Sequence, residues 1–125
     1  MRRTADPPRA DRGQAAIELA LALPLLALLL LAIVQLVVVV RDQLAVVHAA
    51  REGARAAAVS SAPDGDGAAA ARGATSLTPL EVSVGHTNGS AAVTVRYQSR
   101  TDVPLIGAVL PDINVESTAT MRDEP

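Results

Sequence analysis

The chain has 125 residues, of which 50% are hydrophobic, a formal net charge of −2, no cysteine and one aromatic residue, Tyr97. The lack of cysteine excludes a disulfide framework, a zinc ribbon and a thiol nucleophile. Residues 41–125 carry seven arginines against ten acidic residues, so their charge gives no case for binding nucleic acid.

An apolar segment extends from Leu19 to Val40, and its only polar side chain is Gln35. At the helical rise of about 1.5 Å per residue it would be about 33 Å long, enough to cross a bilayer core. A secretory signal peptide has a much shorter apolar region, so the segment predicts a membrane-spanning helix. Sites for signal peptidase follow at Ala49 and Ala58, and a secreted binding domain released there is one alternative.

Glu18 precedes this segment directly. A carboxylate in hydrocarbon costs up to a few kcal/mol, so such a group either reaches the membrane surface or pairs with another group. Arginines flank the segment on both sides, so counting them does not decide which end of the helix lies in the cytoplasm. The additional charge of the amino-terminal amine favours an amino end inside the cell.

The order Gly13-Gln14-Ala15-Ala16-Ile17-Glu18, followed by an apolar helix, is similar to that of type IV prepilins and pseudopilins. The fuller pattern resembles the TadE-like family of tight-adherence (Flp) pilus systems. It comprises residues 12–26 with their Leu23-Pro24 step and the later element Ala49-Ala50-Arg51-Glu52-Gly53-Ala54-Arg55. The resemblance covers residues 12 to about 59. Family members often have an aromatic residue after the glutamate and a Glu-Phe-Gly-like step, where this chain has Leu19 and Gln35-Leu36-Val37.

The resemblance implies cleavage by a membrane prepilin peptidase after Gly13, on the cytoplasmic side. Gln14 would then carry the new α-amine, and Glu18 would meet the amine of a neighbouring subunit and set the register between subunits. The implied partners are the membrane, prepilin peptidase, other pilin or pseudopilin subunits and the tight-adherence assembly machinery, without nucleic acid or a small-molecule substrate. The implied location is the bacterial cytoplasmic membrane, with the head outside the cytoplasm, in or at the base of a pilus.

Helical periodicity continues beyond the apolar segment and predicts one helix from Gln14 to Val59. Its expected apolar face holds Leu44, Val47, Ala54 and Ala58, opposite Arg41, His48, Glu52 and Arg55. Three residues are candidates for helix packing. Pro24 either kinks the helix or is tolerated without effect. Gln35 either forms a hydrogen bond with another helix or is a mildly polar residue without a specific contact. Gly53 allows another helix to approach closely.

Helix-breaking residues occupy 60–67, and a short helix is expected over 68–77. The Asp64-Gly-Asp66-Gly67 step is similar to the start of a calcium loop, but its twelfth position is Thr75, which argues against calcium.

Period-two alternation then predicts three strands. The first has Val82 and Val84 inward, the second Val93, Val95 and Tyr97, and the third Ile113, Val115, Ala119 and Met121. Asn88-Gly89 favours a tight hairpin, although with Ser90 it also forms a glycosylation sequon. The apolar connection 104–111 covers the sheet or touches a partner.

The expected fold is α+β: a long amino-terminal helix that carries a small antiparallel sheet. The expected parts are a cytoplasmic leader (1–13), a transmembrane and stalk helix (14–59, span about 19–40), a linker (60–80) and a three-stranded head (81–125). So small a head needs support from the stalk or from other subunits. The sequence contains no recognisable nucleophile elbow, phosphate loop or metal cluster. His48 and His86 are expected to be surface residues. We therefore expect no enzyme activity and no cofactor. An uncleaved single-pass anchor presenting a binding domain is the second alternative.

Overall fold

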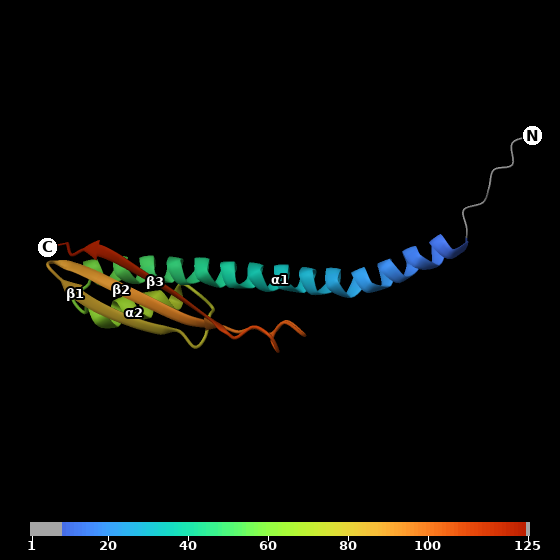
Figure 1. The fold of residues 1–125 in the computed structure, drawn as a ribbon. Helices are drawn as coiled ribbons and strands as arrows, with labels where there is room; N and C mark the ends of the chain where they lie inside the picture. The colour runs from blue at the N-terminus through green and yellow to red at the C-terminus, as the bar shows by residue number, and fades with distance from the viewer. Residues whose placement is uncertain (1–8, 125) are drawn as a thin grey trace, which may run out of the picture.

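The computed structural model describes residues 9–124. A long helix carries a small head at its carboxyl-terminal end, which confirms the expected α+β architecture (Figure 1). The elements in chain order are α1 (Arg9–Val59), α2 (Pro63–Gly73), β1 (Glu81–Thr87), β2 (Ser90–Ser99) and β3 (Ile113–Arg122). Residues 1–8 of the expected leader, with Arg2 and Arg3, lie outside the described residues.

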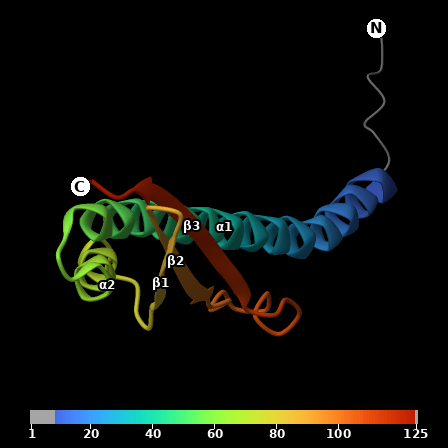
Figure 2. The ribbon, with the colours of Figure 1, turned by 90° about the vertical axis from the view of Figure 1, so that its left-hand side faces the viewer.

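Helix α1 is continuous over 51 residues and begins at Arg9, five residues before the expected start at Gln14. Gly13 therefore lies inside the helix, where an isolated glycine costs only about 1 kcal/mol relative to alanine. The amino-terminal part of α1, which contains Pro24, is curved (Figures 1 and 2). A helical proline lacks the N–H donor and crowds the preceding turn, which accounts for a bend there.

The three strands form one antiparallel sheet in the order β1-β2-β3, as expected. Asn88 and Gly89 join β1 to β2 with φ angles of 51° and 72°, the left-handed conformation that a tight hairpin turn requires. Alternation in β2 buries Val93 and Val95, as its sequence pattern predicted, together with Ala91, whereas Tyr97 is half-buried. In β3, Val115 is buried as expected, but Ile113 and Met121, which were expected to face inward, are exposed near the strand ends.

The core lies between this sheet face and the carboxyl-terminal part of α1, with α2 packed beside them (Figure 2). Its side chains are almost all alanine and valine, so the helix and the sheet approach closely. The sheet therefore depends on α1 for its cover. The buried apolar residues are Val46, Ala49, Ala50, Ala54, Ala57, Ala71, Ala91, Val93, Val95 and Val115.

The stalk face that the sheet covers differs from the expected one. Leu44, expected to be inward, is 65% exposed, whereas Asp42 and Val46 are buried. The sheet packs against the face of α1 that has the smallest side chains, because small side chains allow the closest packing. Ala54 and Ala58 are buried as expected, and Val47 is half-buried.

The bounds of the short helix need correction. Helix α2 begins at Pro63, not at residue 68, so part of the supposed breaker segment forms its first turns. Proline suits the first helical position, and Asp64 and Asp66 interact favourably with the amino-terminal end of the helix dipole. For the connection 104–111, two alternatives were open, and the structure does not support cover of the sheet, since most of its residues are exposed.

Candidate functional site

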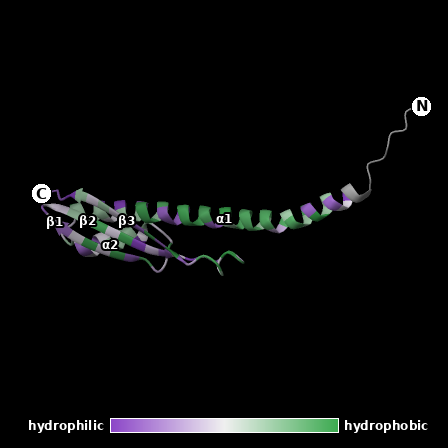
Figure 3. Cartoon of the chain, viewed as in Figure 1, coloured by the Kyte–Doolittle hydropathy of each residue, from purple (hydrophilic) through white to green (hydrophobic). Residues whose placement is uncertain are grey.

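The amino-terminal part of α1 projects beyond the head without cover (Figure 3). Its most apolar 18-residue window has a mean hydropathy of 3.0, and only 6% of that window is buried. A core helix of a soluble protein with this composition would be mostly buried. By length, composition and exposure, α1 therefore suits a membrane anchor.

The three residues of the expected processing and registration site lie on this uncovered helix. Gly13 is exposed, and a β-carbon added there would meet nothing within 4 Å, so no other part of the chain packs against this position. The Gln14 side-chain amide donates to Glu18 Oε1 at 3.3 Å, because residues four apart share one helix face. Both side chains are exposed, and Glu18 forms no ion pair with any described side chain.

Gln35 is the first buried residue along the described part of α1, just after the half-buried Leu31 and Ala32. Its side chain is buried, and Nε2 donates to the Arg100 carbonyl oxygen at 3.5 Å and to Thr101 Oγ1 at 3.4 Å. In this structure Gln35 thus bonds to the head of its own chain. Pro24 lies on the uncovered part of the helix and contacts no element of the head.

A second polar contact, which sequence reasoning missed, lies two turns further along the same helix face. Ser99 Oγ donates to Asp42 Oδ2 at 2.6 Å, and both residues are buried. The pair joins α1 to the end of β2. The available signal was the helical spacing of Asp42 from Gln35 and Val46, which places an acidic residue on the packed face.

Ser99→Ala is expected to destabilise the full chain by about 1 to 3 kcal/mol, because it leaves the Asp42 carboxyl group buried without its donor. Urea unfolding in detergent micelles, followed by circular dichroism, measures the change. The double variant Asp42→Ala/Ser99→Ala removes both partners and is expected to be more stable than the sum of the two single variants predicts. Strict additivity would contradict the pairing.

Gly53, at the centre of the Arg51-Glu52-Gly53-Ala54-Arg55 element, lies at a close approach between α1 and α2. A β-carbon there would lie 2.9 Å from the Gly67 carbonyl oxygen and 2.9 Å from Val93 Cγ1. The helix that approaches Gly53 is therefore α2 of the same chain. Ala54 is buried beside it.

The charged residues of this element face away from the core. Arg51, Glu52 and Arg55 line a shallow groove of about 500 Å³ between α1 and β3, whose far wall is formed by residues 117–121. Among the described side chains, neither arginine has an ion-pair partner within 4.0 Å. The element thus combines an inward packing side with an outward cationic side.

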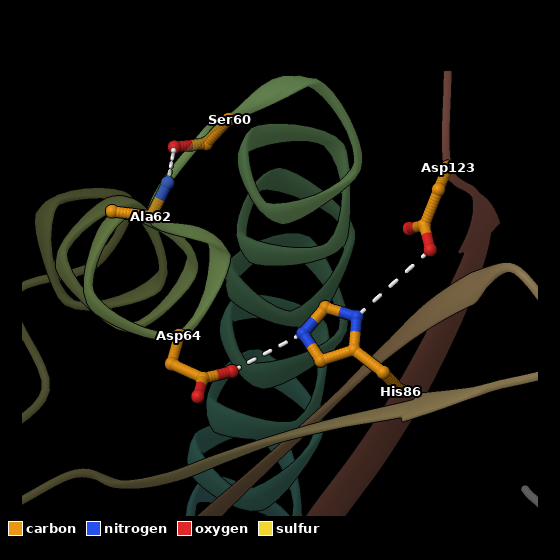
Figure 4. Close-up of polar contacts among 5 residues, drawn as sticks. All are labelled: Ser60, Ala62, Asp64, His86 and Asp123. Carbon is orange, nitrogen blue, oxygen red and sulfur yellow. Dashed lines mark hydrogen bonds and ion pairs between the residues drawn. The ribbon is translucent and has the colours of Figure 1, made fainter. Parts of the chain in front are cut away.

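His86 lies between two carboxylates that are distant in the sequence (Figure 4). Nε2 is 3.1 Å from Asp64 Oδ1, and Nδ1 is 4.0 Å from Asp123 Oδ2. The cluster joins α2, β1 and the segment after β3, where the Asp123 amide also donates to the Gly89 carbonyl at 2.9 Å. The sequence suggested no acidic partner for His86, because Asp64 is 22 residues away and is brought near only by folding.

The remaining polar groups of the head include an exposed ion pair between β2 and β3. No group of three histidine, cysteine or acidic side chains could hold a metal ion within residues 9–124. On the outer sheet face, Arg96 Nε donates to Glu116 Oε2 at 2.5 Å, and this hydrogen bond raises the pKa of the Arg96 guanidinium. Both partners are exposed, and such a pair contributes little to stability.

Comparison with known families agrees with the resemblance inferred from the sequence. The family model described as TadE-like protein matches residues 13–55, which extend from the glycine before Glu18 to Arg55. The matched segment thus contains the uncovered helix, Gln35, Asp42 and the Arg51–Arg55 element. No curated protein and no solved structure matches the chain.

Proposed function

We propose that this chain, whose residues 13–55 match the TadE-like family, is a pseudopilin that acts in the assembly of tight-adherence pili or a related secretion apparatus. The family match associates the chain with the Tad pilus and its membrane machinery. The observation that carries the proposal is the order Gly13–Glu18 at the start of an uncovered helix long and apolar enough to span a membrane.

The proposed work of the protein is assembly rather than catalysis. Prepilin peptidase cuts after Gly13 in the cytoplasm, and the head lies on the other side of the membrane. The new α-amine of Gln14 in one subunit meets Glu18 of another, which offsets part of the cost of a carboxylate in hydrocarbon. The outward arginines, Arg51 and Arg55, are available to an acidic surface of a partner.

We expect the protein from its native membrane to begin at Gln14, because the order Gly13–Glu18 before an apolar helix is similar to that of prepilins, and Gly13 and Gln14 are both exposed. Peptidases bind extended backbone, so the first turns of α1 must open for cleavage; the end of a helix frays at little cost. Intact-mass measurement of the purified protein, with a strain lacking the peptidase as control, tests this.

The same measurement separates the alternatives. A chain that retains residues 1–13 would contradict cleavage and favour an uncleaved anchor that presents the head. A chain beginning at Ala50 or Val59 would indicate release by signal peptidase. The fold argues against such release, because Ala49 and Ala58 are buried against the head, and cutting there removes part or all of the helix that covers the sheet.

A further inference from the structure

The connection between β2 and β3 exposes an apolar tip, defined here as residues 104–111. No residue of this tip is charged, and Leu105, Val109 and Leu110 are all exposed, Val109 to 80%. Apolar surface gathered on one loop is unfavourable in water, and such patches mark contacts with a protein or a membrane.

The tip is ordered by its own backbone. The Gly107 amide donates to the Val103 carbonyl at 2.9 Å, and the Leu110 amide donates to the Ile106 carbonyl at 2.9 Å. Gly107 permits this turn, because a β-carbon there would lie 2.4 Å from the Thr101 carbonyl oxygen. Backbone groups bonded within the segment lower the cost of transfer into hydrocarbon.

Polar groups gather at the base of the tip. The Thr101 amide donates to Asp112 Oδ1 at 3.0 Å, and Thr101 Oγ1 donates to the Pro111 carbonyl at 3.2 Å. The charged neighbours of the tip, Arg100, Asp102 and Asp112, all belong to this base. The connection therefore has a polar base and an apolar end, an arrangement suited to a water–lipid boundary.

The contacts of helix α1 with the base of the tip show where this boundary would lie along the helix. The bonds from Gln35 to Arg100 and Thr101 hold the base level with Gln35. From there the tip extends along α1 towards the amino-terminal end of the helix, beside its uncovered apolar part (Figures 1 and 2). Both segments are strongly hydrophobic (Figure 3).

We propose that residues 104–111 insert into the membrane leaflet nearest the head, and that the bilayer ends level with Gln35. The span is then residues 15–34 rather than 19–40. These residues make about 20, or about 30 Å of helix, which matches the hydrocarbon thickness. Glu18 is their only charged residue. A span reaching Val40 would instead immerse the polar base of the connection and Gln35.

Lipid is the occupant that the geometry favours over a second protein. The tip lies at the same level as a helix segment that itself requires lipid, so insertion of α1 carries the tip to that depth. The inference rests on the membrane insertion of α1, which is part of the proposed function, and not on cleavage or assembly.

Single labels on the full chain in vesicles of phosphatidylethanolamine and phosphatidylglycerol test the inference. Because the chain has no cysteine, Val109→Cys provides the only site for an environment-sensitive nitrobenzoxadiazole label. Val59→Cys is the matched control, since it replaces another exposed valine, 64% exposed, at the far end of the stalk. Leu30→Cys reports the uncovered helix, and circular dichroism checks the fold of each labelled chain.

We expect the fluorescence emission of the label at residue 109 to be blue-shifted and to be quenched by nitroxide lipids, as at residue 30. The label at residue 59 is expected to be quenched by iodide in water. If residue 109 behaves like residue 59 while residue 30 stays in lipid, the tip is not inserted and the inference fails alone. A label at residue 30 that is accessible to iodide overturns the membrane insertion in the proposed function as well. A label at residue 109 that leaves water only at high protein-to-lipid ratio indicates contact with a second copy and also overturns the inference.

Discussion

Replacement of Glu18 by alanine is expected to leave cleavage after Gly13 largely intact and to reduce incorporation into the pilus assembly by about tenfold or more. Glu18 is exposed and lies one helical turn beyond the Gly13–Gln14 bond, and its hydrogen bond within the chain is to the Gln14 side chain. In lipid its charge needs a partner, and the proposal assigns that role to the amine of a neighbouring subunit. Loss of about 1.4 kcal/mol per contact weakens association tenfold.

Two measurements on the same cells test the role of Glu18. Intact mass gives the extent of cleavage, and quantification of the sheared surface fraction against the membrane fraction gives incorporation. Glu18→Gln is the matched control, because it retains the side-chain length and hydrogen bonding but not the charge. Normal incorporation of Glu18→Ala would refute the pairing and support a glutamate that only reaches for the membrane surface. Normal incorporation of Glu18→Gln alone would show that hydrogen bonding is sufficient.

The second large effect is expected at Gly53. Gly53→Val is expected to destabilise the head by about 2 to 3 kcal/mol, because overpacking of a close contact typically costs this amount. The new β-carbon would overlap backbone oxygen of α2 as well as Val93 Cγ1 of the sheet, so α2 and β2 cannot both keep their places. The measurement is urea unfolding of the full chain in micelles, monitored by the circular dichroism of the sheet and helices.

A second glycine supplies the control for this experiment. At Gly65 in α2 an added β-carbon would meet nothing within 4 Å, so Gly65→Ala is expected to be neutral or to stabilise by up to about 1 kcal/mol through helix propensity. If Gly53→Val unfolds at the wild-type urea concentration, the close approach of α1 and α2 is not the structure in solution. Equal losses at both sites would indicate that the two helices pack loosely throughout.

Much of the architecture could be predicted because its signals are local. The apolar segment, the alternation in β1, β2 and β3, and the Asn88-Gly89 turn each depend on a few consecutive residues. The bounds of α2 were missed because Pro63 and the glycines after it break helices in most contexts. Here Pro63 occupies a first helical position, and glycine at 67 allows the contact with α1.

The candidate site was likewise predicted from the sequence only in part. Gly13, Gln14 and Glu18 were recognisable from their order before an apolar helix, and Gln14 and Glu18 lie on an uncovered helix as expected, whereas Gly13 was expected before the helix and lies inside it. Gly53 was recognised as a packing residue, but its neighbour was not, because nothing in the sequence specifies which helix approaches. The contacts of Asp42 with Ser99 and of His86 with Asp64 connect residues 57 and 22 positions apart.

By itself, the sequence determined that the chain has a helix long and apolar enough to span a membrane and a prepilin-like order at Gly13–Glu18, because hydrophobic length and a short motif do not depend on tertiary contacts. Only the tertiary structure decided which face of the stalk is packed, since that choice depends on a sheet formed 20 and more residues later. It also decided that Gln35 holds the base of the 104–111 tip and that the tip extends along α1. The proposed depth of the head relative to the membrane rests on these contacts, which no local sequence pattern encodes.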